Sequence, residues 1–321
     1  MENRDAGPGQ ATPLEARIEV LRPQLRRLEA DVLCLQEVNA EPSIKGGPRV
    51  PHALDRLLEG TPYEGFRRFA GGGAGDPHFL ADVHNLVILS RFPMIAARSL
   101  RHVLVEPPRY RPAMARPAAE AEEAVAWDRP ILAVEIDLPD AGRLHVINLH
   151  LRAPLAAAVA GQKESAFVWR STAGWAEGFF LAAVKRAGQA LEARLLVDEI
   201  FDRDAEARIV VLGDFNAEEW EVPVRTLCAE VEDTGKGRLA GRALVPLERS
   251  LPETRRFSLV HHGRRVMLDH ILASRALLAG YRGIELHNET VGDELIGYAL
   301  VDQATVSYHA PLVAEFALSS S

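Results

Sequence analysis

Residues 209–216 read Ile-Val-Val-Leu-Gly-Asp-Phe-Asn, an apolar run followed at once by a carboxylate and, two positions later, a carboxamide. Four aliphatic residues in a row predict a strand that is buried on both faces. Asp214 and Asn216 are two positions apart, so in an extended chain their side chains project to the same side. Such oxygen-rich groups suit a divalent cation, a water molecule or a phosphate, although the same pair is often a turn device.

Four further segments place polar groups at the edges of apolar runs. Glu37 follows one apolar strand, Asn148 and His150 close another, and His309 precedes the last strand of the chain. Asp269 lies inside an apolar strand, where a carboxylate is costly unless a histidine or a cation pairs with it. Each segment alone has an ordinary structural interpretation, such as a surface charge or a packed histidine. Together they favour one polar cleft.

Composition limits the classes of protein. The chain has 321 residues, of which 47% are hydrophobic, and this is enough for one large core. We expect a single domain over residues 1–321. The net charge of -8 disfavours strong non-specific adhesion to nucleic acid or anionic lipid, but it does not exclude a nuclease. Two unrelated cysteines fit a reducing compartment, and we expect a cytoplasmic protein.

No apolar run is long enough to predict a membrane span, and the charged start of the chain excludes an ordinary signal peptide. Nothing in the sequence indicates an obligate protein partner.

The order of predicted elements indicates an α/β protein. An apolar stripe from residue 14 to residue 28 predicts a helix, and residues 131–136 and 144–149 flank a turn as a hairpin. Residues 153–201 are Ala-rich and predict a long helical insertion, with Gly178 and Gly188 as candidate breaks. Mixed hairpins and helices favour packed sheets covered by helices.

In the same order along the chain, these polar segments resemble the motifs of the endonuclease/exonuclease/phosphatase superfamily. The matching motifs are Leu35-Gln36-Glu37, Asn148-Leu149-His150-Leu151, Gly213-Asp214-Phe215-Asn216, Leu268-Asp269-His270-Ile271-Leu272 and Ser307-Tyr308-His309-Ala310-Pro311-Leu312. Residues 85–93 also look like a strand of that family. The resemblance implies a four-layer α/β/β/α sandwich of the DNase I-like type. It also implies hydrolysis of phosphate esters with Mg²⁺ or Mn²⁺, and nucleic acid is one candidate substrate.

The resemblance also implies roles for the residues that match these motifs. Glu37 would be the principal metal ligand, and Asp214 would orient or deprotonate the attacking water. Asn216 would hold that water or a phosphate oxygen. His150 would contact the phosphate, and His309 would complete the site.

The remaining site residues are less strongly specified. Asp269 would orient His309, or alternatively His150. Asn148 shares a strand face with His150, so a phosphate-binding role is an even choice against a structural one. Arg129 and Arg152 are expected near the mouth of the cleft, where they would hold substrate phosphates unless they form surface ion pairs.

One departure concerns the metal. The family usually ends in Ser-Asp-His, and Tyr308 occupies the Asp position here. A phenol is neutral near pH 7 and brings no negative charge to a cation. Asp302, or one of Glu289, Asp293 and Glu294, is a candidate replacement. We therefore expect a single, weakly held metal ion.

A second departure concerns the start of the chain. The family opens with a strand ending in an Asn, and residues 1–5 resemble the continuation of that motif, so we expect the first core strand to be missing. Two functions remain open: a phosphate-ester hydrolase, with phosphodiester or nuclease activity ahead of phosphomonoester activity, and a catalytically impaired phosphate-binding protein.

Overall fold

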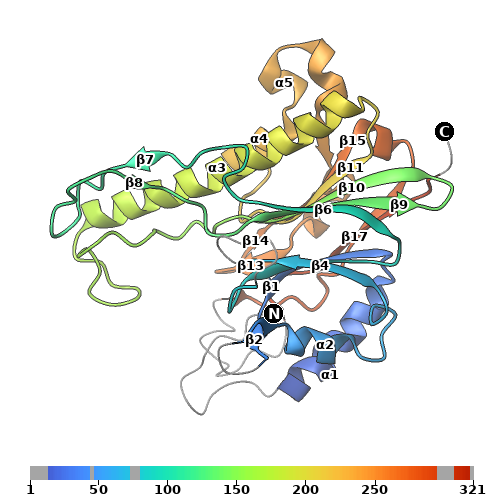
Figure 1. Ribbon diagram of the computed structural model, residues 1–321, viewed down its shortest axis with the longest axis horizontal. Helices are drawn as coiled ribbons and strands as arrows, with labels where there is room; N and C mark the ends of the chain where they lie inside the picture. Colours follow the sequence, from blue (N-terminus) through green and yellow to red (C-terminus); the bar gives the residue numbers. More distant parts are fainter. Residues whose placement is uncertain (1–13, 44–46, 73–79, 295–306, 319–321) are drawn as a thin grey trace.

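In the computed structural model, two β-sheets pack face to face, and helices cover the outer face of each (Figure 1). The structure describes residues 14–43, 47–72, 80–294 and 307–318. The outer layers consist of α1 (Leu14–Leu28) with α2 (His52–Leu58), and of α3 (Thr172–Arg203) with α4 (Val222–Cys228). This is the four-layer α/β/β/α arrangement that the sequence predicts.

The larger sheet has six strands in the order β12-β15-β11-β10-β9-β6. Their bounds are β6 (Met94–Leu100), β9 (Ile131–Leu138), β10 (Gly142–His150), β11 (Ile209–Asp214), β12 (Leu244–Pro246) and β15 (Asp269–Ser274). The predicted hairpin is confirmed as the antiparallel pair β9–β10, whereas β10 and β11 run parallel. The run that opens the sequence analysis thus becomes an inner strand.

Within the described ranges, the other sheet layer has two parts that no strand joins. One part has the order β1-β5-β4, and the other is the antiparallel pair β16–β17. Their bounds are β1 (Val32–Val38), β4 (Arg67–Gly71), β5 (Asn85–Ser90), β16 (Tyr281–Leu286) and β17 (Leu312–Phe316). Residues of β1 and β17 share both the core between the sheets and the core beneath α1, so both parts belong to one layer.

The remaining elements are short. They are β2 (Glu41–Pro42), β3 (Arg49–Val50), β7 (Arg109–Tyr110), β8 (Glu123–Ala124), β13 (Leu259–His261), β14 (Arg264–Val266), α5 (Val231–Thr234), α6 (Arg275–Leu278), and the 3₁₀ turns η1 (Gly237–Arg242), η2 (Leu247–Ser250) and η3 (Glu253–Arg255).

The apolar run of β11 is explained by its two packed faces. Val210 lies in the core between the sheets, and Val211 lies in the core beneath α3. Both side chains are at least nine-tenths buried. Each buried side chain of this size contributes about 1.5–3 kcal/mol relative to exposure. No polar residue could replace them cheaply on either face, which is why alternation is absent.

The predicted helical insertion is correct only in its second part. Residues 153–171 form no helix and contain only turns, bends and one β-bridge. The helix α3 begins after Ser171, whose hydroxyl caps it by accepting a hydrogen bond from the Gly174 N–H at 3.0 Å. Gly178 and Gly188 do not break the helix. A Cβ at Gly178 would lie 2.3 Å from the Ala157 carbonyl oxygen, so this glycine permits close packing instead.

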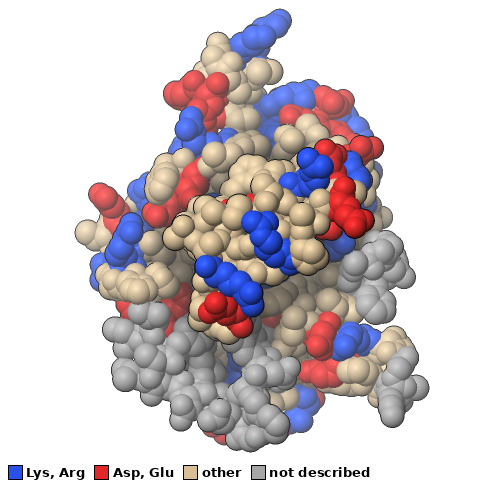
Figure 2. Space-filling model, turned by 90° about the vertical axis from the view of Figure 1, so that its left-hand side faces the viewer, with Lys and Arg blue, Asp and Glu red and all other residues tan. Residues whose placement is uncertain are grey.

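The amino-terminal half of α3 projects from the sandwich together with β7 and β8 (Figure 1). A buried carboxylate holds this projection: Glu177 accepts hydrogen bonds from the backbone N–H groups of Ala113 and Met114 and from the Tyr110 hydroxyl of β7. Figure 2 faces this end, and uncharged atoms make up most of the centre of that face. Among the described residues, no helix has the length and apolar character needed to cross a membrane.

Candidate active site

Three polar side chains form a row across three adjacent strands of the larger sheet. His150, the last residue of β10, is the register partner of Asp214 on β11, and Asp214 in turn faces Asp269 on β15. Register partners in a sheet project to the same side, and neighbouring strands are about 4.8 Å apart. Strand pairing alone therefore brings together groups that are 119 positions apart in the sequence (269 − 150).

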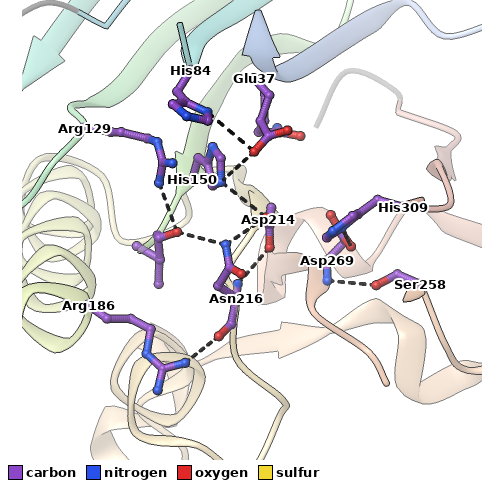
Figure 3. A network of polar contacts seen from close by, with 12 residues as sticks. Glu37, His84, Arg129, His150, Arg186, Asp214, Asn216, Ser258, Asp269 and His309 are labelled. Carbon is purple, nitrogen blue, oxygen red and sulfur yellow. Dashed lines mark hydrogen bonds and ion pairs between the residues drawn. The ribbon is translucent and has the colours of Figure 1, made fainter. Parts of the chain in front are cut away.

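The other sheet supplies a carboxylate to the same place. His150 Nε2 lies 3.3 Å from Asp214 Oδ2 and 3.8 Å from Glu37 Oε1, so one imidazole touches carboxylates from both layers (Figure 3). Glu37 lies in an irregular part of β1 and has a φ of +57°, which turns its side chain toward the larger sheet. His84 Nδ1 lies 3.5 Å from the same Glu37 oxygen.

These contacts set the charge of each group. Burial opposes ionisation of Glu37, but the hydrogen bond with His84 and nearby positive charges together outweigh it and lower the pKa of Glu37 to about 2. Burial also lowers the pKa of His150 well below its usual value, so this imidazole is neutral. A carboxylate therefore stands beside an uncharged ring that can donate or accept a hydrogen bond.

A second histidine–carboxylate pair lies beside this row. His309 Nδ1 is 2.7 Å from Asp269 Oδ2, and the Ser258 hydroxyl accepts a hydrogen bond from the Asp269 N–H. Burial opposes the charge on His309, but Asp269 prevails and raises the pKa of His309 to about 10. Burial and the charge of Asp269 raise the pKa of Asp214 to about 7.

The turn after β11 fixes the orientation of Asp214. The Asn216 backbone N–H donates to Asp214 Oδ1 at 2.8 Å, and Asn216 Nδ2 donates to Asp214 Oδ2 at 2.9 Å. Asn216 Nδ2 also donates to the Leu151 carbonyl at 3.0 Å. Arg186 of α3 donates to the carbonyl of Asn216 from behind. The direct partners of the Asn216 amide are thus Asp214 and the Leu151 carbonyl.

These groups line a cavity of about 2120 Å³. Ligand atoms of Asp214, Asp269 and His309 lie within 4.8 Å of one another, which is the spacing of a cation site. Carboxylate oxygens, here those of Asp214 and Asp269, are suitable donors for Mg²⁺ or Mn²⁺. The residues present therefore fit a divalent cation.

A family model for the endonuclease/exonuclease/phosphatase family matches residues 5–309. The chain belongs to this family. Members of the family are phosphoester hydrolases. No curated protein sequence matches the chain.

Solved structures of similar fold cover nearly all of it. An endonuclease/exonuclease/phosphatase protein from Beutenbergia cavernae is 19% identical, with a TM-score of 0.53, and the match covers 98% of this chain and 68% of that one. A 3′ phosphatase from Neisseria, bound to a product DNA hairpin, is 18% identical, with a TM-score of 0.52, over 94% and 95% of the two chains. A mannosyl-6-phosphatase from Bacteroides thetaiotaomicron is 13% identical, with a TM-score of 0.57, over 99% and 96%. At such identities the likeness shows the fold.

Asn148 does not lie where a phosphate-binding role would need it. Its side chain is fully buried between the sheets, where it donates to the carbonyls of Leu35 and Val87 and accepts from Gln36 Nε2 at 2.7 Å. Every polar atom of this amide is thus used to join the layers. The structural interpretation that the sequence left open fits this geometry.

The two arginines differ in their surroundings. Arg129 lines the cavity, donates weakly to the Leu151 carbonyl at 3.4 Å, and has a pKa lowered by burial despite the nearby charge of Glu37. Arg152 also lines the cavity, but its guanidinium pairs with Asp128, which Lys185 contacts at 2.8 Å. The structure thus gives Arg152 the ion pair that sequence reasoning held as its alternative.

The acids considered as replacements at the Tyr308 position have other partners. Glu289 pairs with Arg27, Asp293 accepts from the Gly263 N–H, and Glu294 contacts His261. Asp302, like the expected continuation motif at residues 1–5, lies outside the described residues.

Sequence reasoning missed two groups that shape the site, His84 and Arg186. His84 stands directly before the predicted strand at 85–90, and its position at a strand end was an available signal. Arg186 lies in the middle of an Ala-rich helix, and no local pattern distinguishes it from a surface arginine.

Proposed function

We propose that the chain is a Mg²⁺- or Mn²⁺-dependent hydrolase of phosphate esters that acts on phosphodiesters, including nucleic acid, in preference to phosphomonoesters. The observation that carries this proposal is the meeting of Glu37, Asp214 and His309, from different strands and layers, in one cavity. Family membership supports the reaction class.

Glu37 is proposed as the principal ligand of the cation, because it is ionised and faces the cavity. A bound cation would neutralise charge on the phosphate oxygens. Asp214, held at both carboxylate oxygens by Asn216, orients or deprotonates the attacking water. The carboxamide oxygen of Asn216 can accept a hydrogen bond from that water, whereas its Nδ2 donors are used within the protein and do not serve a phosphate oxygen.

His309 is proposed to carry a proton and to donate from Nε2 to a phosphoryl oxygen, with Asp269 holding Nδ1. His150 is neutral and donates or accepts a hydrogen bond at the phosphate. Arg129 supplies a positive charge that interacts with Glu37 in the cavity. Together these groups surround a phosphate from several sides, which in-line attack requires.

The preference for phosphodiesters rests on indirect support. One solved relative is a 3′ phosphatase bound to DNA, so the fold accommodates nucleic acid; that relative and a mannosyl-6-phosphatase are both named for phosphomonoester hydrolysis, which supports the alternative reaction as well. A phosphomonoesterase of a small metabolite or a lipid headgroup is the alternative within the same chemistry.

The test compares three substrates: supercoiled plasmid, bis(p-nitrophenyl) phosphate and p-nitrophenyl phosphate, each with Mg²⁺, Mn²⁺ or EDTA. We expect turnover that EDTA abolishes and that is fastest with a diester. Asp214→Ala and His309→Ala should abolish it. Turnover that persists in EDTA, or that is unaffected by both substitutions, would contradict the proposal.

The number of bound metal ions is a separate proposal. Because the described acids near Tyr308 have other partners, we propose one weakly held ion. Calorimetric titration with Mg²⁺ should give one site, and two tightly bound ions per chain would contradict this.

A second candidate function is phosphate binding without turnover. Tyr308, which brings no carboxylate to the site, favours it. Calorimetric binding of inorganic phosphate, in a protein that turns over none of the three substrates with any metal, would establish this function in place of hydrolysis.

A further inference from the structure

Arg129 lies on an irregular segment of backbone. Residues 127–130 form no helix or strand, and β9 begins directly after them. Arg129 nevertheless lines the cavity of the candidate active site. Since strand pairing does not hold this segment, contacts with a neighbouring element have to fix its position.

One face of α3 supplies those contacts. Residues three or four positions apart share a face of a helix, and four α3 residues with that spacing meet the segment. They are Lys185, which contacts the Asp128 carboxylate at 2.8 Å, Gly188 and Glu192, which meet Trp127, and Gln189, which meets Arg129 and Pro130. A single helix face therefore contacts four consecutive residues.

Trp127 anchors the segment to the helix. Its indole N–H donates to Glu192 at 2.9 Å, and neither side chain is more than 1% exposed. A Cβ at Gly188 would lie 2.7 Å from the Trp127 ring, so the indole packs directly against the helix there. Glu192 also accepts from the backbone N–H groups of Val103 and Leu104 at 2.6 and 3.0 Å. The carboxylate thus joins three parts of the chain through donors that satisfy it away from solvent.

Gln189 holds the backbone of Arg129 itself. Its side chain is 1% exposed, and Nε2 donates to the Arg129 carbonyl at 3.1 Å and lies 3.5 Å from the Pro130 carbonyl. Buried carbonyls need such a donor. Because the contact is with the main chain, it sets the point from which the Arg129 side chain extends.

The Arg129 side chain has only a long contact at its tip. Nη1 lies 3.4 Å from the Leu151 carbonyl, an oxygen that also accepts from Asn216 Nδ2 at 3.0 Å (Figure 3). Glu37 and Asp214 favour the charge of Arg129, although burial lowers its pKa. The guanidinium therefore lies close to the groups proposed to hold the attacking water, and the placement of its backbone decides how it meets a phosphate.

We propose that Gln189 is a positioning residue, which holds the Arg129 backbone so that the guanidinium is ready to bind a phosphate oxygen of the substrate. Trp127, held by Glu192, anchors the same segment two residues earlier. A binding group that is already in place loses less freedom when a ligand arrives, and the gain is in affinity. This inference rests on the proposed function, in which Arg129 contacts the substrate phosphate.

A purely structural role for Gln189 is the alternative. Its amide would then satisfy buried carbonyls and support the fold without any particular relation to the Arg129 side chain. The two roles differ in additivity. A positioning residue acts through Arg129, so its replacement has no further effect once Arg129 is replaced, whereas independent effects add.

The test measures KM and kcat on bis(p-nitrophenyl) phosphate with Mg²⁺ for Gln189→Leu, Arg129→Ala and the double variant. Leucine fills much of the same space but donates no hydrogen bond. Gln189→Leu should raise KM about fivefold and change kcat less than about twofold, because the guanidinium is displaced rather than removed. The double variant should have the KM of Arg129→Ala alone.

Arg194→Leu is the matched control. Arg194 is another buried α3 side chain that donates to backbone carbonyls, those of Leu227 in α4 and Arg242 in η1. The control should lower the urea midpoint, as Gln189→Leu also should, but leave KM unchanged. Gln189→Met, which fills the site with a flexible side chain, replaces Gln189→Leu if that variant does not fold.

Calorimetric binding of inorganic phosphate in the presence of Mg²⁺ repeats the comparison without turnover. Kd should rise about fivefold in Gln189→Leu, and the double variant should match Arg129→Ala. Absence of turnover in the parent chain would contradict the hydrolase alone, since this readout depends only on phosphate binding.

Two results would overturn the inference. The first is a folded Gln189 variant with the KM and phosphate affinity of the parent chain. The second is a loss that adds to that of Arg129→Ala in the double variant, which would assign Gln189 a structural role only.

Discussion

The two sheet layers differ in how they hold the candidate site. The larger sheet is continuous, and the register of β10, β11 and β15 alone sets the row of His150, Asp214 and Asp269. The other layer is divided, and it contributes Glu37 from an irregular strand segment with positive φ. Hydrogen-bonded strand pairing fixes the positions of the residues on the larger sheet, whereas an irregular stretch of backbone places Glu37 on the other layer. We call His150, Asp214 and Asp269, which the larger sheet holds, the rigid half of the site. We call Glu37, which the irregular part of β1 holds, the adjustable half.

The largest expected effect is the loss of catalytic rate when Asp214, in the rigid half of the site, is replaced. Asp214→Asn keeps the shape of the side chain but removes its charge, so it should lower kcat on bis(p-nitrophenyl) phosphate about a thousandfold, as expected for loss of a catalytic base. Circular dichroism should show an unchanged fold. Asp137→Asn, on the exposed part of β9 in the same sheet, is the matched control and should have little effect. Equal activities of the two variants would remove Asp214 from the chemistry.

The next largest effect is on the free energy of unfolding, through a buried ion pair behind the rigid half of the site. His270, behind the row, lies 2.5 Å from the buried Glu248 and contacts the Ala217 carbonyl at 2.8 Å. His270→Gln leaves a buried carboxylate without its charged partner and should cost about 3 kcal/mol in the free energy of unfolding. Urea denaturation measures it, with the exposed His261→Gln as control. A loss no larger than that of the control would contradict a stabilising pair.

The same pair should make stability depend on pH. Burial opposes protonation of His270, but the charge of Glu248 raises its pKa above the ordinary value of 6.5. A raised folded-state pKa means that the stabilisation is complete below about pH 6.5 and is lost as pH rises through the folded value. The stability difference between the parent and His270→Gln should therefore shrink toward alkaline pH. A constant difference would show that His270 does not titrate in the folded protein.

A smaller effect compares the two layers directly. In the parent chain, amides of β1 and β17 should exchange with solvent about 30-fold faster than those of β11, because their edges lack a second strand partner among the described residues. Hydrogen exchange with mass spectrometry measures this. Equal protection of both layers would mean that the divided layer is as firmly held as the continuous one.

The smallest effect separates two arginines at the cavity. Arg129→Ala should raise KM about tenfold, because this guanidinium has only a long contact with a carbonyl and faces Glu37 across the cavity. Arg152→Ala should change KM less than about twofold, since Asp128 already takes its charge. Steady-state kinetics on the diester gives both values, and the reverse order would exchange the two assignments.

Several elements were predictable because their signals are local. The apolar run at 209–212 is buried on both faces, and the hairpin of β9 and β10 surrounds the turn that the sequence indicates. The start of α3 was not predictable from composition. Alanine favours helix throughout residues 153–171, yet the cap at Ser171 and the packing around Gly178 decide where the helix begins.

Within the site, motif residues were easier to find than their partners. Glu37, Asp214 and His309 stand at strand ends in the sequence and meet in one cavity. Asn148 looked equally suitable, but the packing of two sheets turns its amide into the interior. His84 also stands at a strand end, but the sequence does not show that this strand brings it to Glu37, which lies on a different strand.

The sequence by itself determined the layered α/β class, the family and the polar groups at strand ends, because periodicity and short motifs are properties of neighbouring residues. Only the tertiary structure decided which of those groups meet, which amide is used to join the sheets, and that the described strands of one layer form two separate parts. These outcomes depend on register between distant strands and on packing of one layer against another, which are long-range interactions that no local pattern encodes.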